Sequence, residues 1–266
     1  MKYGFLILYG MMILFPLLFI MVSSLKTNDE IFTKPFALPE IWNFFIYYEV
    51  WTRYKFQIYF LNSLYYATVS VAISTTISAM AAYAFSRMQW KLRTPAMMVV
   101  LLGLMVPVHS EIVPLYIFFA KLGLKNPQFN LIGVFVAFSI PLCVFLISGF
   151  IRALPLELEE AAVIEGSGLI RVFFSIILPL LKPVIATVII FNFLNVWNDF
   201  FTSLIFINQD SQKTLQLGIS SFTGNYATKY GELLTAVMIS VIPSTIVYMI
   251  FQEKIISGLT AGAVKG

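Results

Sequence analysis

The chain has 266 residues, of which 59% are hydrophobic and only 11% are charged, and its formal net charge is +4. Soluble domains carry about 25% charged residues, so this composition predicts a membrane protein. The single cysteine, Cys143, excludes an intramolecular disulfide framework and a cysteine zinc cluster, and the single histidine, His109, leaves no histidine pair for a metal. The sequence has no G-x-x-x-x-G-K-[ST] loop for a nucleotide phosphate. We therefore expect no enzyme, no metal site and no bound cofactor in this chain, and nothing in the sequence suggests nucleic acid.

Six runs with little or no charge are long enough to cross a bilayer, whose core about 30 Å thick needs ~20 helical residues. The first covers residues 3–25, and we interpret it as an anchor because no small-residue cleavage site follows a short apolar core. The others cover residues 58–85, 95–120, 130–151, 183–207 and 232–251. The sequence thus predicts an all-α membrane protein whose residues 1–266 form one transmembrane domain.

Prolines and small residues inside these runs indicate how the helices would pack. Each of Pro107, Pro114, Pro141 and Pro243 removes a backbone hydrogen bond, and we expect kinks for packing more than gates. In the second run, small residues recur every four positions and predict a face for close helix packing. They are Ser70, Ser74, Ser78 and Ala82.

Six spans place both chain ends on one side of the membrane, and basic residues indicate which side. The connections divide the 17 Lys and Arg almost evenly, with nine on the side of the termini and eight on the other. Short basic connections next to spans set orientation, and "RMQWKLR" packs Arg87, Lys91 and Arg93 into seven residues. We therefore expect both termini in the cytoplasm. The outer Lys26, Lys34, Arg53 and Lys55 should be solvated or contact lipid headgroups.

A polar segment at residues 155–183 separates the fourth and fifth spans, on the expected cytoplasmic side. "LELEEAAVIE" favours a helix with three glutamates near its positive N-terminal end. Gly166 and Gly168 permit a sharp turn, and "LIRVFFSIIL" favours a second helix that runs until Pro179. The exposed face should carry small alanines beside a carboxylate that could pair with a partner's arginine. This pattern predicts a helix-turn-helix that docks onto a cytoplasmic partner.

"EAAVIEGSGLIRVFFSIILPLLKP" resembles the EAA loop of ABC-importer permeases, whose pattern is E-A-A, three residues, a glycine and later I-x-L-P. Glu165 stands where the family usually has aspartate. The resemblance implies that this loop transmits motion from an ATPase subunit. The residues that it assigns to the ATPase-coupling loop are Glu160, Ala161, Ala162, Glu165, Gly166, Arg171, Leu178 and Pro179, and Ile176 completes the pattern.

Further segments resemble the carbohydrate-uptake permeases of the maltose-transporter type, and the MalG-like subunit more than its MalF-like partner. They are "NSLYYATVSVAISTTISAMAAYAFSR", "VWNDFF", "TLQLGISSF" and "GLTAGAVKG". The resemblance implies a multi-pass protein of a bacterial or archaeal cytoplasmic membrane that moves a sugar or oligosaccharide by alternating access. The implied partners are a second, MalF-like permease, two ABC ATPase subunits that bind ATP and Mg, an extracytoplasmic sugar-binding protein and membrane lipid.

The polar residues of the fifth span are candidates for the substrate pathway. Asn192, Asn195 and Asp199 recur on one helical face, with Asn198 beside them. Polar groups at membrane depth should face the bundle interior or water, where amides suit hydroxyl-rich ligands. The alternatives are hydrogen bonds between helices, or a position of Asp199 at the outer interface.

Two other polar features allow more than one interpretation. His109 and Glu111, near Pro107 and Pro114, are expected to satisfy backbone groups or line an outer vestibule rather than relay protons. Between the last two spans, a loop of this chain aligns with the segment of the maltose-type relative that reaches into the ligand site of the binding protein. The loop in this chain is shorter. Its candidate residues are Ser220, Ser221, Phe222, Asn225 and Tyr226.

Two other functions remain open at this point. The same ABC architecture could carry a polyol phosphate or a peptide. A self-sufficient ion-coupled carrier would need coupling-ion residues at the midplane and usually an internal repeat, and no repeat relates the first three spans to the last three.

Overall fold

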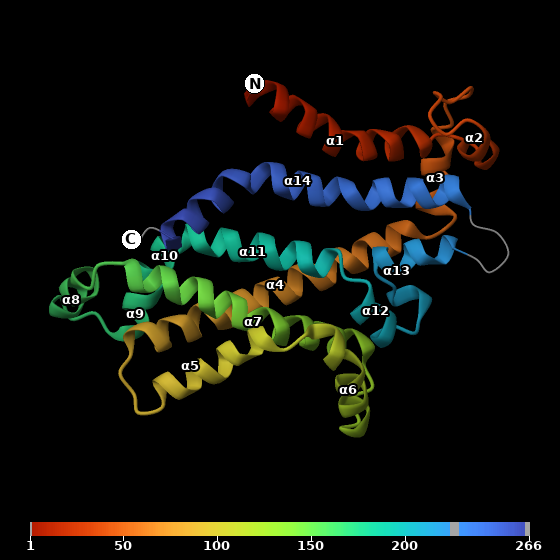
Figure 1. Cartoon of the computed structure of the whole chain (residues 1–266). Coiled ribbons are helices and arrows are strands. Elements are labelled where there is room, and N and C mark those ends of the chain that lie inside the picture. Colours follow the sequence, from red (N-terminus) through yellow and green to blue (C-terminus); the bar gives the residue numbers. More distant parts are fainter. Residues whose placement is uncertain (1, 224–228, 264–266) are drawn as a thin grey trace. The chain divides into compact units, whose positions relative to one another are not determined.

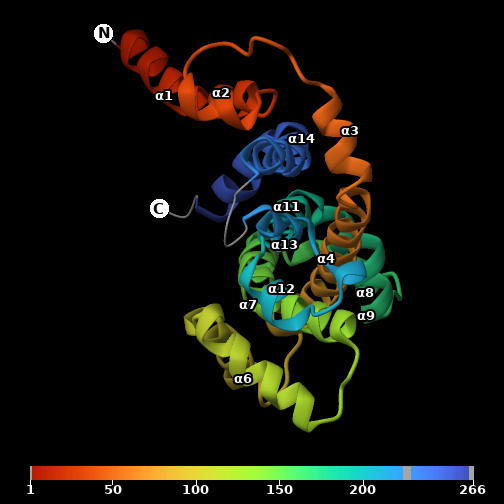
Figure 2. The same ribbon diagram turned by 90° about the vertical axis from the view of Figure 1, so that its right-hand side faces the viewer.

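The computed structural model describes the backbone of residues 2–223 and 229–263 and the side chains of residues 3–223 and 229–252. These residues form helices joined by turns, and no β-strand occurs among them, which confirms the all-α prediction (Figure 1, Figure 2). The chain divides into two compact units. The first comprises Met1–Ser63 and Gln209–Thr245, and the second comprises Leu64–Asn208 and Ile246–Gly266.

Four single helices in the described part of the chain are each long and apolar enough to cross a membrane. They are α1 (Lys2–Ser23), α4 (Phe56–Arg87), α7 (Pro127–Ala153) and α14 (Tyr230–Ala263). Two further pairs of helical segments pass the same test together but are bent, so the count rises to six if each bent pair is one span. The helix α1 exposes large apolar side chains along its length, as expected of a helix that faces lipid or another membrane subunit.

The third span, for which proline kinks were expected within residues 95–120, is broken into separate helices. It consists of α5 (Arg93–Leu102), the 3₁₀ turn η1 (Gly103–Met105) and α6 (Val108–Lys121), with a bend of 107° between the two arms. Pro107 has no N–H to donate, and Val106 before it is extended with ψ 117°, which ends the helix. A Cβ on Gly103 would lie 2.7 Å from Pro141 Cγ, so a glycine is needed for close contact with α7.

The fifth span is also interrupted. Instead of one helix over residues 183–207, the chain forms α11 (Lys182–Trp197) and a short α12 (Phe201–Phe206). Asn198 Nδ2 donates to Leu194 O at 2.8 Å, and Asp199 Oδ1 accepts from Ser203 N at 3.0 Å. Asn and Asp side chains that bond to nearby backbone compete with the helix, which explains the break at these two residues.

Four short helical segments connect α7 to α11. They are α8 (Glu157–Ile164), α9 (Leu169–Val172), the π turn η2 (Phe173–Ile177) and α10 (Leu178–Leu180). The arm Leu169–Leu180 is bent by 73° from α11. A π turn lacks the normal helical hydrogen bonds, and here it lies just before Pro179, which cannot donate one.

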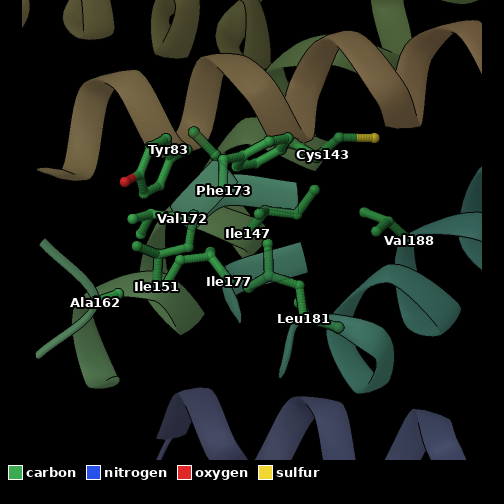
Figure 3. Close-up of a cluster of buried hydrophobic side chains, with 13 residues drawn as sticks. Tyr83, Cys143, Ile147, Ile151, Ala162, Val172, Phe173, Ile177, Leu181 and Val188 are labelled. Carbon is green, nitrogen blue, oxygen red and sulfur yellow. The ribbon is translucent and has the colours of Figure 1, made fainter. Parts of the chain in front are cut away.

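The core of the second unit joins α4, α7, α8 and α11 (Figure 3). Tyr83, Ile147, Phe173 and Ile177 lie at its centre and expose at most 6% of their surface. The small residues expected on one face of α4 are all buried, which confirms that this face packs closely: Ser70, Ser74, Ser78 and Ala82.

The first unit contains α2 (Asn28–Thr33), α3 (Phe45–Thr52), the 3₁₀ turns η3 (Asp210–Gln212) and η4 (Ser220–Phe222), and α13 (Leu215–Ile219). Lys26 was expected to be solvated, but it is 1% exposed. Its Nζ donates to Lys34 O at 3.0 Å and to Pro35 O at 2.9 Å. The buried ammonium therefore satisfies two carbonyl groups of the segment that follows α2.

Candidate functional site

The helix-turn-helix at residues 157–180 presents an exposed apolar surface. Gly166 makes the turn possible because its φ is +84°, a left-handed conformation that disfavours residues with a Cβ. Gly168 has a φ of −75°, which any residue can adopt, so its backbone conformation does not require a glycine. On either side of the turn, Ile164 and Ile170 expose 86% and 77% of their surface. Both isoleucine side chains are therefore available for contact with another molecule.

The residues expected to couple to an ATPase do not all share this surface. Glu160, Ala161, Glu165 and Gly166 are exposed, together with Arg171 and Pro179, whereas Leu178 is half-buried. Ala162 is 7% exposed and belongs to the core. The expectation that both alanines lie on the exposed face was therefore wrong for Ala162, because the helix turns this position toward α7 and η2.

Sequence reasoning missed the inward role of Glu159. Its Oε1 lies 2.7 Å from Arg87 Nε, and the two side chains are 12% and 10% exposed. Tyr83 OH donates to Glu159 Oε2 at 3.1 Å. Glu159 and Ala162 are three residues apart and so share a helical face, but this spacing does not say whether that face turns inward.

The second candidate site is a cavity of about 290 Å³ between α6, α7, α11 and α12. Apolar side chains form much of its wall. Its polar lining residues are His109, Ser139, Asn192, Asn195, Asp199 and Thr202. Three of the four residues expected in a substrate pathway thus meet at one cavity, and Asn198 is not among its lining residues.

The pathway candidates have different local environments. Asn192 is 2% exposed and its Nδ2 donates to Cys143 Sγ at 2.8 Å, whereas Asn195 is exposed. Asp199 accepts from Thr202 Oγ1 at 2.8 Å and from Ser203 Oγ at 3.0 Å. The carboxylate of Asp199 therefore accepts hydrogen bonds from N–H and hydroxyl groups in the first turn of α12. Asn195 instead keeps its amide available to the cavity.

His109 and Glu111, which were expected together, have different surroundings. The His109 ring lines the cavity and makes an edge contact with Phe201, with the ring centroids 5.4 Å apart. Glu111 is half-buried in the first turn of α6 and is not among the residues that line the cavity. The geometry gives no carboxylate–imidazole pair for a proton relay between these two residues.

The segment expected to face a binding protein lies in the first unit. Phe222 is 4% exposed and packs against Tyr54 and Phe56, with centroid distances of 5.0 and 5.4 Å. Phe222 is therefore a core residue, contrary to a role in reaching a partner. Ser220 Oγ donates to Leu217 O at 2.7 Å, and Ser221 is exposed. Asn225 and Tyr226 lie outside the described residues.

Within the described residues, no three His, Cys, Asp or Glu side chains come together as a metal site. The hydrogen-bonding groups at the cavity are amides and hydroxyls, together with the imidazole of His109 and the carboxylate of Asp199. At the helix-turn-helix the available chemistry is apolar contact beside the exposed carboxylate of Glu160.

Residues 74–260 match the model of a family described as the binding-protein-dependent transport system inner membrane component. The chain belongs to this family. It is therefore an inner-membrane transport component, as the residues of its EAA-type loop predicted.

Individual relatives extend the likeness over nearly the whole chain. The diacetylchitobiose uptake system permease protein NgcG of Streptomyces coelicolor is 36% identical over 98% of this chain and 87% of its own length. The multiple sugar-binding transport system permease protein MsmG of Streptococcus mutans is 35% identical over 99% of this chain and 96% of its own. Both relatives are permease subunits of transport systems.

Among solved structures, the chain resembles one from a bacterial ABC transporter involved in the import of the acidic polysaccharide alginate. The TM-score is 0.83, with 20% sequence identity, and the match covers 95% of this chain and 94% of that one. At this identity the likeness establishes the fold alone.

Proposed function

We propose that this chain is the transmembrane permease subunit of a binding-protein-dependent ABC importer for a sugar or oligosaccharide. The observation that carries the proposal is the likeness over 98% of this chain to NgcG, a permease of a diacetylchitobiose uptake system. In this role the chain moves its substrate by alternating access and catalyses no reaction. ATP and Mg bind to two partner ATPase subunits, and a second, MalF-like permease completes the pathway.

In the proposed assembly, residues 155–183 lie in the cytoplasm and dock onto an ATPase subunit, and both chain termini lie on the same side. The exposed Ile164 and Ile170 beside Glu160 support this assignment. An apolar patch can fill a pocket of the partner, while an exposed carboxylate can pair with a partner's arginine. Gly166 fixes the turn that brings the two exposed isoleucines to one end of the segment.

The cavity lined by Asn192, Asn195 and Asp199 is proposed to border the substrate pathway. Amides and hydroxyls with apolar walls suit a neutral, hydroxyl-rich ligand, which needs hydrogen bonds and no counter-charge. The one carboxylate of the lining, that of Asp199, already accepts hydrogen bonds from Thr202 and Ser203. The described lining contains no Lys or Arg, so it offers no cation to a phosphate group. On the opposite side of the membrane from the coupling loop, Ser220 and Ser221 are proposed to face the sugar-binding protein.

The experiment is uptake by proteoliposomes that contain this chain, its partner permease and the ATPase subunits, with the binding protein added. Radiolabelled chito- and malto-oligosaccharides serve as probes, and a dipeptide and glycerol phosphate are the competing substrate classes. We expect oligosaccharide uptake that requires the binding protein on one side of the membrane and ATP on the side of the ATPase subunits. Uptake of the dipeptide or glycerol phosphate alone would contradict the substrate class, and ATP-independent uptake driven by an ion gradient would contradict the importer.

A further inference from the structure

Glu159 lies on the opposite side of α8 from the exposed docking surface, and both of its carboxylate oxygens have partners on α4. Arg87 Nε lies 2.7 Å from Oε1, and Tyr83 OH donates to Oε2 at 3.1 Å. Since the two charged side chains are 10% and 12% exposed, solvent screens the pair little. The inner face of α8 is therefore bound to the last turns of α4.

The same arginine also binds the end of α7. Arg87 Nη2 donates to Ile151 O at 2.8 Å and to Leu154 O at 2.7 Å. The last carbonyl groups of a helix have no partner within the helix and carry partial negative charge, so a guanidinium is a suitable cap. Arg87 thus joins α4, α7 and α8 through one side chain with several fixed donors.

Packing strengthens this junction on the apolar side. Ala162, one turn after Glu159, is buried in the same core as Ile151. The ring of Tyr83 lies against Phe173, with centroids 5.2 Å apart, and Figure 3 shows the two rings side by side above Ala162 and Ile151. A closely packed core transmits displacement because it has little room to deform.

We propose that Arg87, Tyr83 and Glu159 form a positioning cluster that makes α8 and the adjoining ends of α4 and α7 move as one body. This inference rests on the proposed docking of α8 onto an ATPase subunit and adds the path by which its displacement reaches two membrane spans. A partner that pushes on Glu160 and Ile164 then displaces α4 and α7 directly. The exposed face receives the partner, and the inner face passes on the motion.

The test compares Glu159→Gln, Arg87→Lys and Tyr83→Phe with Glu157→Gln, a substitution of an exposed glutamate in the same first turn. Glu159→Gln removes the charge, and Arg87→Lys keeps the charge but lacks the fork that reaches Glu159 and two carbonyl groups. Each complex is purified with all its subunits, and uptake per ATP hydrolysed is measured in proteoliposomes. We expect Glu159→Gln and Arg87→Lys to lower this ratio by a factor of about five, Tyr83→Phe to lower it less, and Glu157→Gln to leave it unchanged.

Two further comparisons separate a transmission role from a structural one. Because the two charged residues act as a unit, the double variant Arg87→Lys with Glu159→Gln should lose no more coupling than the worse single variant. Full coupling in the single variants, or additive losses in the double variant, would overturn the proposal. Co-purification of the ATPase subunits should survive in Glu159→Gln and fall in Glu160→Ala. Undiminished co-purification in Glu160→Ala contradicts the docking proposal itself, whatever the Glu159 variants do.

Discussion

Asn192 on α11 donates a hydrogen bond to the sulfur of Cys143 on α7, over a distance of 2.8 Å. Both side chains are buried, at 2% and 0% exposure. Asn195, three residues later on the same helical face, is exposed and lines the same cavity. One asparagine therefore joins two helices, while the other presents its amide to the cavity.

This difference predicts opposite effects of the same substitution at the two asparagines. Asn192→Leu should lower the free energy of unfolding by about 1–2 kcal/mol, because it removes an interhelical hydrogen bond and changes the shape of a buried site. Asn195→Leu should change stability by less than about 0.5 kcal/mol and should reduce uptake or alter the substrate ranking. Melting temperature and substrate profile, measured on the same complexes, check both statements. A lowered melting temperature with an unaltered substrate ranking in Asn195→Leu would contradict the pathway role.

The turn between α8 and α9 predicts a difference between its two glycines. Gly166 has φ +84° and no atom within 4 Å of an added Cβ, so any cost of Gly166→Ala comes from the backbone alone. We expect a loss of about 1–2 kcal/mol. Gly168 has φ −75° and equally open surroundings, so Gly168→Ala should cost less than about 0.5 kcal/mol. Thermal denaturation of the two variants is the measurement, and equal losses would contradict the assigned backbone cause.

In the first unit, α13 approaches the start of α4 closely at Gly218. A Cβ there would lie 2.4 Å from Tyr59 Cδ2, and Tyr59 is 7% exposed, so its ring has little room to move. Gly218→Ala should lower the free energy of unfolding by about 1–3 kcal/mol. Gly133→Ala, in α7 with nothing within 4 Å, should instead raise it by about 0.5–1 kcal/mol because alanine favours helix. Denaturation curves that show the same sign for both variants would contradict this explanation.

Hydrogen bonds to Glu30 predict a pH dependence of the segment after α1. The backbone N–H of Thr27, and then that of Glu40, donate to its carboxylate and hold the pKa of Glu30 below its ordinary value of 4.5. A lowered folded-state pKa gives stability that is fully present above pH 4.5 and is lost as the pH falls through the folded value. The melting temperatures of wild type and Glu30→Gln should therefore differ at neutral pH and converge in acid. If the difference in melting temperature grew as the pH fell, it would contradict a lowered folded-state pKa of Glu30.

The sequence revealed the apolar spans and the EAA-type loop because both depend on local patterns. Uncharged runs of sufficient length predicted α1, α4, α7 and α14, and the glycine and proline positions predicted the turn before α9. The breaks near Pro107 and Asn198 were harder to predict. A proline or an asparagine permits a break, but whether the helix ends there depends on contacts such as that of Gly103 with Pro141.

The candidate sites show the same limit. The face shared by Asn192, Asn195 and Asp199 followed from helical spacing, and the cavity that they line agrees with it. The inward turn of Ala162 and the burial of Lys26 and Phe222 did not follow from spacing. The burial of Phe222 and the pairing of Glu159 with Arg87, 72 positions away (159 − 87), depend on residues distant in sequence. The ammonium of Lys26 instead bonds to carbonyl groups eight and nine positions along the chain, in a fold of the loop that spacing does not reveal.

The exposed end of α8 offers the most direct test of the proposed importer. A photo-cross-linking amino acid is placed at Ile164, which is 86% exposed. The matched control is Phe129, which is 64% exposed near the start of α7, whereas α8 follows the end of α7. After illumination of the complete complex in membranes, the proposed function predicts a cross-link from position 164 to an ATPase subunit and none from position 129. A cross-link from position 164 to the binding protein, or from position 129 to the ATPase subunit, would contradict both the orientation and the coupling role of the segment.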